Sequence, residues 1–159
     1  MRGNALVVTD SDEHGEDGHM IDDAQIRTRM MLKRLKKLEG ARKEVPAPRF
    51  QQKTGARATL IGWGSACGAI GEAASLLERD NIGVNVLQIN GLWPFPARAV
   101  ASALRKSRKN FVIENNATGQ LAHLIRAETG IKVSNRILKF DGRPLSPDYI
   151  AEEVKKEVA

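Results

Sequence analysis

The strongest constraint on the fold is a strand-then-helix pattern that recurs four times between residue 57 and the carboxyl terminus. Short apolar runs typical of buried strands begin at Leu60, Val84, Phe111 and Ile137. Each run is followed by apolar residues at helical spacing. Consecutive strand-to-helix units are typical of a mostly parallel sheet with helices on both faces. We therefore expect an α/β protein.

Ordinary capping residues mark the starts of several of these helices. Pro96 is a favoured first helical residue, and Ser146 before Pro147 caps the last helix. Thr118 is a good N-cap for the helix that begins near Leu121.

The first third of the chain has a different organisation. Residues 5–8 are apolar and predict a short strand, and residues 9–23 predict a polar loop. A helix is expected from Ile26 to about Arg42, because Met31, Leu35 and Leu38 recur at helical spacing. Prolines then indicate a linker over residues 47–55. We expect residues 1–56 to pack on an α/β domain formed by residues 57–159, giving one compact domain overall.

Composition narrows the class of protein. A chain of 159 residues has the length of one domain. Cys67 is its only cysteine, which excludes an internal disulfide and a cysteine-ligated iron–sulfur cluster built from this chain alone. No apolar run approaches the roughly 20 residues that span a bilayer, and the amino terminus turns acidic where a signal peptide would be apolar. A cytoplasmic location without a membrane partner is expected.

The charge pattern argues against nucleic acid as a partner. The formal charge is +6, but seven carboxylates lie in residues 10–23, just before a basic helix. Such an acidic loop can neutralise the helix or match a partner. Aromatic residues make up only 4% of the chain and none interleaves with the basic run, so bases would find no stacking platform there.

The best candidate for a site is residues 114–120, which we call the polar knot. It follows the buried strand at Phe111, so it lies at the carboxyl end of that strand, where open α/β sheets bind ligands and partners. A purely structural reading is a helix start, with Thr118 as cap and Gly119 in a tight turn. That reading explains Thr118 better than it explains the remaining polar residues of the knot, which are Glu114, Asn115, Asn116 and Gln120.

A second turn, at residues 62–68, follows a strand and opens a helix. Its glycines match neither a dinucleotide fingerprint nor a P-loop. Small residues that let strand and helix pack closely are the preferred reading. The helix dipole could lower the pKa of Cys67 and make it a nucleophile, although no general base accompanies it.

The acidic loop also raises the possibility of a metal site. His14 and His19 lie among carboxylates, but their spacing matches no zinc motif. No metal ligand and no catalytic residue is therefore assigned.

Seven short motifs together carry a family resemblance. They are Ser11-Asp-Glu-His, Gly18-His, Lys33-Arg-Leu-Lys-Lys-Leu-Glu39, Gly62-Trp-Gly-Ser65, Pro94-Phe-Pro96, Glu114-Asn-Asn-Ala-Thr-Gly-Gln-Leu121 and Phe140-Asp-Gly-Arg-Pro144. In this order they resemble the carboxyl-terminal domain of the alpha subunit of 2-oxoacid:ferredoxin oxidoreductases, of the pyruvate, 2-oxoglutarate or 2-ketoisovalerate type. Departures are mild: Ala66 stands where a threonine is usual, and Leu145 where an aromatic often follows.

The resemblance implies a transketolase C-terminal-like fold, a three-layer α/β/α sandwich with a mixed five-stranded sheet. It also implies oxidative decarboxylation of a 2-oxoacid to acyl-CoA, with thiamine diphosphate, Mg²⁺ and iron–sulfur clusters held by other domains or subunits. Asn115-Asn116 resembles the end of a thiamine-diphosphate motif, but no G-D-G precedes it, so this chain is expected to bind no cofactor. Ferredoxin and coenzyme A would be partners of the whole complex.

The resulting hypothesis is an assembly and closure domain that is inactive alone. Its interface or ligand-facing residues would be Glu114, Asn115, Asn116, Gly119 and Gln120, with Asp12, Glu13, His14, Asp141 and Arg143 as second candidates. Arg143 is included because a fixed guanidinium can bind a carboxylate or phosphate bidentately. The alternative is a free-standing module that binds a nucleotide, coenzyme A or nucleic acid.

Overall fold

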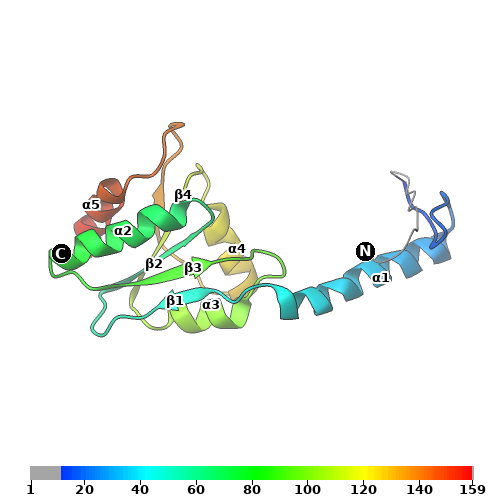
Figure 1. Ribbon diagram of the computed structural model, residues 1–159, viewed down its shortest axis with the longest axis horizontal. Coiled ribbons are helices and arrows are strands. Elements are labelled where there is room, and N and C mark those ends of the chain that lie inside the picture. Colours follow the sequence, from blue (N-terminus) through cyan, green and yellow to red (C-terminus); the bar gives the residue numbers. More distant parts are fainter. Residues whose placement is uncertain (1–11, 159) are drawn as a thin grey trace, which may run out of the picture. The chain divides into compact units, whose positions relative to one another are not determined.

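A computed structural model describes residues 12–158 and shows two compact units (Figure 1). The first unit ends at Glu44 and the second begins at Val45. The strand predicted at residues 5–8 lies outside the described residues. The division falls at 44/45 rather than at 56/57, and the packing of residues 1–56 on the α/β domain stays a prediction.

The described part of the first unit is a short polar hairpin followed by one long helix. Helix α1 spans Ala24–Glu44, which confirms the predicted helix. The Asp23 carboxylate caps it by accepting hydrogen bonds from the backbone N–H groups of Gln25 and Ile26 at 3.0 and 2.8 Å. Within the described chain, every helix is too short or too polar to traverse a bilayer.

The second unit is built on a five-stranded mixed sheet in the order β1-β3-β2-β4-β5. The strands are β1 (Arg49–Gln51), β2 (Ala58–Trp63), β3 (Val84–Ile89), β4 (Lys109–Glu114) and β5 (Asn135–Leu138). Strands β2 to β5 run parallel, and β1 pairs antiparallel with β3. The expected mixed five-stranded sheet is confirmed, and the four strand-to-helix units supply its parallel part.

Strand β1 lies where the sequence indicated a linker. Its three residues pair with β3 in the register Arg49 to Gln88, Phe50 to Leu87 and Gln51 to Val86. Three residues are too few to show the alternation that identifies a strand, and Phe50 is their only apolar side chain. Pro46 and Pro48 just before β1 are typical of an edge position, where fewer backbone N–H groups need partners.

Four helices cover the two faces of the sheet. They are α2 (Ala66–Arg79), α3 (Ala97–Leu104), α4 (Gln120–Thr129) and α5 (Pro147–Val158). Helices α2 and α5 pack together on one face, and α3 and α4 on the other (Figure 1). The expected three-layer α/β/α sandwich is confirmed.

Strand β4 shows why the continuous apolar runs predicted buried strands. Phe111 and Ile113 point into the core beneath α2 and α5, whereas Val112 points into the core beneath α3 and α4. All three are at most 1% exposed. A strand covered on both faces must be apolar at every position, which abolishes the alternation of a half-buried strand.

A buried polar network ties together the amino ends of the strands. Asn85 in β3 donates to the Thr59 hydroxyl in β2 at 3.2 Å, and that hydroxyl lies 2.7 Å from the hydroxyl of Ser107. The side-chain oxygen Oδ1 of Asn85 accepts a hydrogen bond from the backbone N–H of Lys53 at 2.8 Å. Because Thr59 and Asn85 are at most 1% exposed, these bonds fix the loops on that edge of the sheet.

Gly62 provides a test of the close packing expected between β2 and α2. A Cβ added at Gly62 would lie 2.2 Å from Cδ1 of the buried Ile70. We expect Gly62→Ala to lower the free energy of unfolding by about 1–3 kcal/mol through overpacking, measured by urea denaturation.

Gly71→Ala is the matched control, because a Cβ there meets nothing within 4 Å. This residue lies inside α2, so the same change should raise stability by up to about 1 kcal/mol. Equal effects of the two substitutions would contradict the packing account.

Candidate functional site

The polar knot lies between β4 and α4, at the carboxyl end of the sheet as predicted. Glu114, the last residue of β4, is only 2% exposed. Its carboxylate accepts hydrogen bonds from the backbone N–H groups of Leu121 and Ala122, at 2.9 and 3.4 Å, and from Asn116 Nδ2 at 2.8 Å. A negative charge at the amino end of a helix is stabilised by the helix dipole as well as by these bonds.

Asn116, in the turn before α4, caps the same helix. Its Oδ1 accepts from three backbone N–H groups, those of Thr118, Gly119 and Gln120, at 3.2, 2.7 and 3.3 Å. Gly119 has φ 71°, a left-handed conformation that glycine adopts readily. The prediction that Thr118 is the cap is wrong, because the longer Asn116 side chain reaches all three donors from within the turn.

The knot therefore has an inner and an outer part. Glu114 and Asn116 use their polar atoms within the fold, and Gly119 is buried. Asn115 and Gln120 are exposed. Of the five knot residues predicted to face a ligand or interface, these two present their side chains to the surroundings.

The predicted turn at residues 141–143 lies beside the polar knot. The Asp141 carboxylate accepts from the Arg143 backbone N–H at 3.1 Å and pairs with Lys139 Nζ at 2.5 Å. The hydrogen bond from Lys139 holds the pKa of Asp141 below its ordinary value. Asn115 Nδ2 donates to the Arg143 carbonyl at 3.5 Å, which joins the two turns.

These turns form an open cavity of about 580 Å³, the carboxyl-edge cavity. It is lined by Ser65, Asn115, Lys139, Phe140, Gly142, Arg143, Pro144 and Leu145. Ser65 follows β2, Asn115 follows β4, and the remainder follow β5. The structure thus brings together two candidates, Asn115 and Arg143, that are far apart in sequence. The cavity lies where strand order reverses around β2, the usual ligand position in open sheets.

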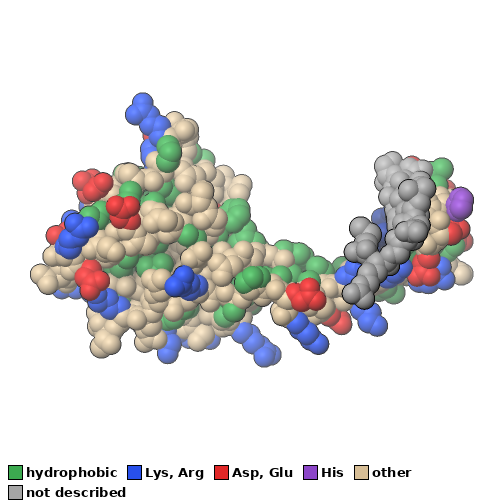
Figure 2. Space-filling view, viewed as in Figure 1, with side chains coloured by type: hydrophobic (Ala, Val, Ile, Leu, Met, Phe, Trp, Pro, Cys, Tyr) green, Lys and Arg blue, Asp and Glu red, His purple; other side chains and the backbone are tan. Residues whose placement is uncertain are grey.

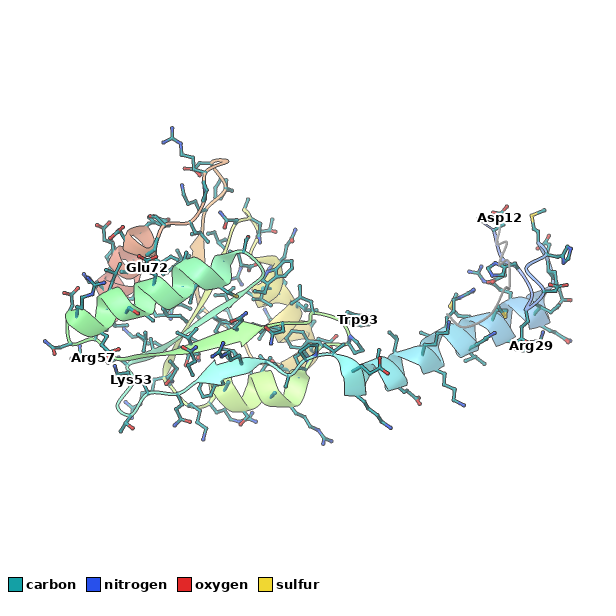
Figure 3. All side chains as sticks on the ribbon, in the orientation of Figure 1. Asp12, Arg29, Lys53, Arg57, Glu72 and Trp93 are labelled. Carbon is teal, nitrogen blue, oxygen red and sulfur yellow. The ribbon has the colours of Figure 1, made fainter. Side chains whose placement is uncertain are left out.

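Exposed aromatic side chains lie at the carboxyl ends of three strands of the sheet. Trp63, Trp93 and Phe140 are 41%, 63% and 70% exposed, and they are the large hydrophobic side chains that the described part of the second unit leaves exposed. They follow or end β2, β3 and β5, and we call them the aromatic rim. Trp93 points outward beyond the end of β3 (Figure 3), and hydrophobic side chains reach the surface on that margin of the unit (Figure 2).

Sequence reasoning did not select the aromatic rim. Its members lie within a few residues of predicted strand ends, which is the signal that could have found them. Lys139 was missed for another reason. Its ammonium group is held by the Asp141 carboxylate and by the ring of Tyr149, whose centre lies 5.9 Å from Nζ, and the contact with Tyr149 forms only in the folded chain.

The 62–68 turn is a packing feature rather than a nucleophile site. Gly62 leaves room for Ile70, as preferred from the sequence. Cys67 lies in the first turn of α2, where burial raises the pKa of its thiol. The suggestion of a lowered pKa is wrong in direction, because desolvation disfavours the thiolate.

The acidic loop of the first unit pairs with the helix that follows it. Glu13 receives two hydrogen bonds from Arg34, at 3.0 and 2.6 Å, and an ion pair from Arg27 at 3.0 Å. The bonds from Arg34 hold the pKa of Glu13 below its ordinary value. Lys33 pairs with Glu16 at 2.9 Å. Self-neutralisation, one of the two expected outcomes, is confirmed for these carboxylates.

Asp12 is exposed and His14 is partly exposed in the same loop. The His14 backbone bridges to Met20 across the hairpin. Among residues 12–158, no three His, Cys, Asp or Glu side chains lie close enough to hold a metal ion together. The interface role predicted for Asp12, Glu13 and His14 stays a prediction.

Removing the buried carboxylate should destabilise the second unit. Glu114→Ala would leave two backbone N–H groups of α4 and the Asn116 amide without their acceptor. We expect a loss of about 2–4 kcal/mol in unfolding free energy, measured by chemical denaturation. Gln120→Ala, at an exposed position of the same knot, should change it by less than about 0.5 kcal/mol. A mild effect of Glu114→Ala would refute the buried-cap description.

Comparison with known proteins identifies the family of this chain. Residues 56–150 match the family described as pyruvate:ferredoxin oxidoreductase core domain II. The alpha subunit of 2-oxoacid:ferredoxin oxidoreductase 1 from Sulfurisphaera tokodaii is 35% identical over 98% of this chain. The alpha subunit of 2-oxoacid:ferredoxin oxidoreductase 2 from Aeropyrum pernix is 34% identical over 97% of it. The chain spans about a quarter of the length of these curated relatives, 25% and 24% respectively.

Solved structures show the same relationship. A 2-oxoglutarate:ferredoxin oxidoreductase from Magnetococcus marinus, with 2-oxoglutarate, coenzyme A and succinyl-CoA bound, matches 99% of this chain and 28% of its own chain. The TM-score is 0.82 and the sequence identity 30%. A split-gene transketolase matches at TM-score 0.55 and 19% identity, over 69% of this chain and 41% of its own, which shows the shared fold alone. The chain therefore belongs to the pyruvate:ferredoxin oxidoreductase core domain II family and corresponds to that region of 2-oxoacid:ferredoxin oxidoreductase alpha subunits.

Proposed function

We propose that this chain is the assembly and closure domain of a thiamine-diphosphate-dependent 2-oxoacid:ferredoxin oxidoreductase. The enzyme would oxidatively decarboxylate a 2-oxoacid and transfer the acyl group to coenzyme A. The observation that carries the assembly role is the aromatic rim, because Trp63, Trp93 and Phe140 are exposed at the carboxyl ends of three strands.

Exposed tryptophan and phenylalanine side chains at one edge favour a protein interface. Aromatic residues are enriched at interface centres, and tryptophan dominates the binding energy of many of them. Elsewhere in the described second unit, large apolar side chains are buried or half-buried. Burying the rim against a neighbouring domain or subunit would remove its apolar surface from water.

The carboxyl-edge cavity supports the closure role. It is open to solvent and is lined by Lys139 and Arg143 as well as by Asn115. A partner that covers Phe140 would also cover this cavity, because Phe140 lines it. Enclosure positions groups and excludes water, which can raise a rate without supplying a reacting atom.

The cofactors would belong to partner domains or subunits. A single cysteine cannot ligate an iron–sulfur cluster alone. The Magnetococcus marinus enzyme was solved with 2-oxoglutarate, coenzyme A and succinyl-CoA bound, which supports coenzyme A as a partner of the whole complex, with ferredoxin as electron acceptor. The lone cysteine also supports a reducing, cytoplasmic location.

Co-purification tests the proposed function directly. We expect the tagged chain, expressed in its native cells, to co-purify with polypeptides that carry thiamine diphosphate and iron–sulfur clusters. The complex should reduce ferredoxin with a 2-oxoacid and coenzyme A, and a substrate panel would identify the acid. Unaided keto-acid oxidation by the isolated chain would overturn the assembly role. Salt-sensitive retention of the isolated chain on nucleic acid, without partners, would favour the free-standing module.

Substitution of the aromatic rim tests the assembly surface. We expect Trp93→Ala or Phe140→Ala to weaken association with the co-purifying subunits by about tenfold or more, as for interface anchors. Arg126→Ala, at the exposed far end of α4, is the control and should change association by less than about threefold. Association would be measured by titration of purified components. Unchanged association of both rim variants would contradict the proposed surface.

A further inference from the structure

A second cavity lies at the opposite edge of the sheet, and its surroundings are strongly basic. It has a volume of about 510 Å³ and is lined by Ala56, Arg57, Arg105, Lys106, Ser107, Arg108, Lys109 and Val158. These residues precede β2 and β4 or end α5. Arg57 and Trp93 lie at opposite ends of the second unit (Figure 3). We call this feature the basic cavity.

The charge of the chain is concentrated in the unit that carries the basic cavity. Residues 1–44 hold 9 Lys and Arg against 9 Asp and Glu, whereas residues 45–159 hold 16 against 10. The whole formal charge of +6 therefore belongs to the second unit. Five of its 16 basic residues line this cavity, and no acidic side chain does.

The cationic groups of the cavity are not neutralised by carboxylates of the described chain. All five are exposed, and none forms an ion pair within residues 12–158. Arg57 and Lys109 donate instead to the backbone carbonyls of Val158 and Glu157 at the end of α5. These carbonyls lie at the negative end of the α5 dipole, so they offset the charge of Arg57 and Lys109 only in part.

The loop that carries these cations is held rigidly from beneath. The Ser107 hydroxyl contacts Thr59 at 2.7 Å and donates to the Lys109 carbonyl at 3.0 Å. The Asn110 amide donates to the Leu104 carbonyl at 3.1 Å, which closes the turn after α3. Arg105, Lys106 and Arg108 therefore project from a fixed backbone. A fixed array of cations can match a complementary surface with less loss of conformational entropy.

We propose that the basic cavity docks an acidic segment of a partner protein. Several spaced carboxylates match five exposed cations spread around an open depression. A small phosphate ligand fits less well, because every cationic side chain is exposed. Nucleic acid fits less well because no aromatic side chain lines the cavity. The chain's own acidic loop is a poor occupant, since Glu13 and Glu16 are already paired within the first unit.

The basic cavity is a separate binding surface from the aromatic rim. The two features lie at opposite ends of the parallel strands, one before β2 and β4 and the other after β2, β3 and β5. A polypeptide bound at one edge would leave the other free. The proposal therefore does not require the assembly role to be correct.

Binding of fluorescein-labelled hexaglutamate to the full chain, followed by anisotropy at low salt, tests the proposal. We expect the triple substitution Arg105→Ala, Lys106→Ala, Arg108→Ala to weaken binding by about tenfold, because each exposed ion pair contributes modestly. The matched triple is Arg98→Ala, Arg126→Ala, Lys132→Ala, which removes the same charge from exposed positions elsewhere. It should weaken binding by less than about twofold. Circular dichroism would establish that both variants are folded.

Three outcomes of this experiment would overturn the proposal. Equal loss in the two triples would mean that net charge alone attracts the peptide. Labelled single-stranded DNA of equal charge that binds more tightly and depends on the same three residues would assign the cavity to nucleic acid. Inorganic pyrophosphate that displaces the peptide at a lower concentration than unlabelled peptide does would assign it to a small anion.

Cross-linking in the assembled complex gives an independent readout. A zero-length carbodiimide joins a lysine to a carboxylate that it contacts. We expect Lys106 to be linked to an Asp or Glu of another polypeptide, identified by mass spectrometry of the purified complex. Linkage of Lys106 only within its own chain, or its absence, would contradict docking at this site.

Discussion

The arrangement of the turns at the carboxyl ends of the strands depends on the hydrogen bonds of the buried Glu114 carboxylate. Glu114 is the last residue of β4, and its carboxylate accepts hydrogen bonds from the backbone N–H groups of Leu121 and Ala122 in the first turn of α4. One side chain thus joins the strand to the helix. Asn116 donates to the same carboxylate and caps the turn between them. Because Asn116 is fixed, its neighbour Asn115 can project outward and bond the 141–143 turn. The open cavity is thus positioned by a charge that the solvent hardly reaches.

The fold could be predicted from the sequence because its core elements have strong periodic patterns. Phe111, Val112 and Ile113 form a run that only a doubly covered strand requires, and Ile70 and Leu77 mark the helix on one of its faces. The resemblance supplied the three-layer arrangement, which the structure confirms. Strand β1 escaped because an edge strand of three residues is defined by its pairing with β3, and pairing leaves almost no trace in so short a segment.

The sequence was enough to locate the candidate site but not to tell which of its residues face inward and which face outward. Strand ends were enough to find the polar knot and the 141–143 turn. Glu114 and Asn116 turn inward because their side chains are long enough to reach the backbone N–H groups at the start of α4. The distance from these residues to α4 is set by the packing of the folded chain and cannot be read from the sequence. The aromatic rim was missed for a related reason, since an exposed Trp63 and a buried Ile61 occupy the same apolar strand. The comparisons then placed the whole chain in a family but left these residue roles to be tested.

The outer strand β5 restricts how this unit can join other polypeptides. It is the last strand of the sheet and has only four residues, with the exposed Arg136 in its middle. Short, charged border strands resist continuation of a sheet by a foreign chain. Opposite, β1 is shorter still and begins with an exposed arginine. We therefore expect neighbours to recognise side chains at the two ends of the strands rather than to extend the sheet through backbone hydrogen bonds, so that binding would depend on the chemical identity of those side chains.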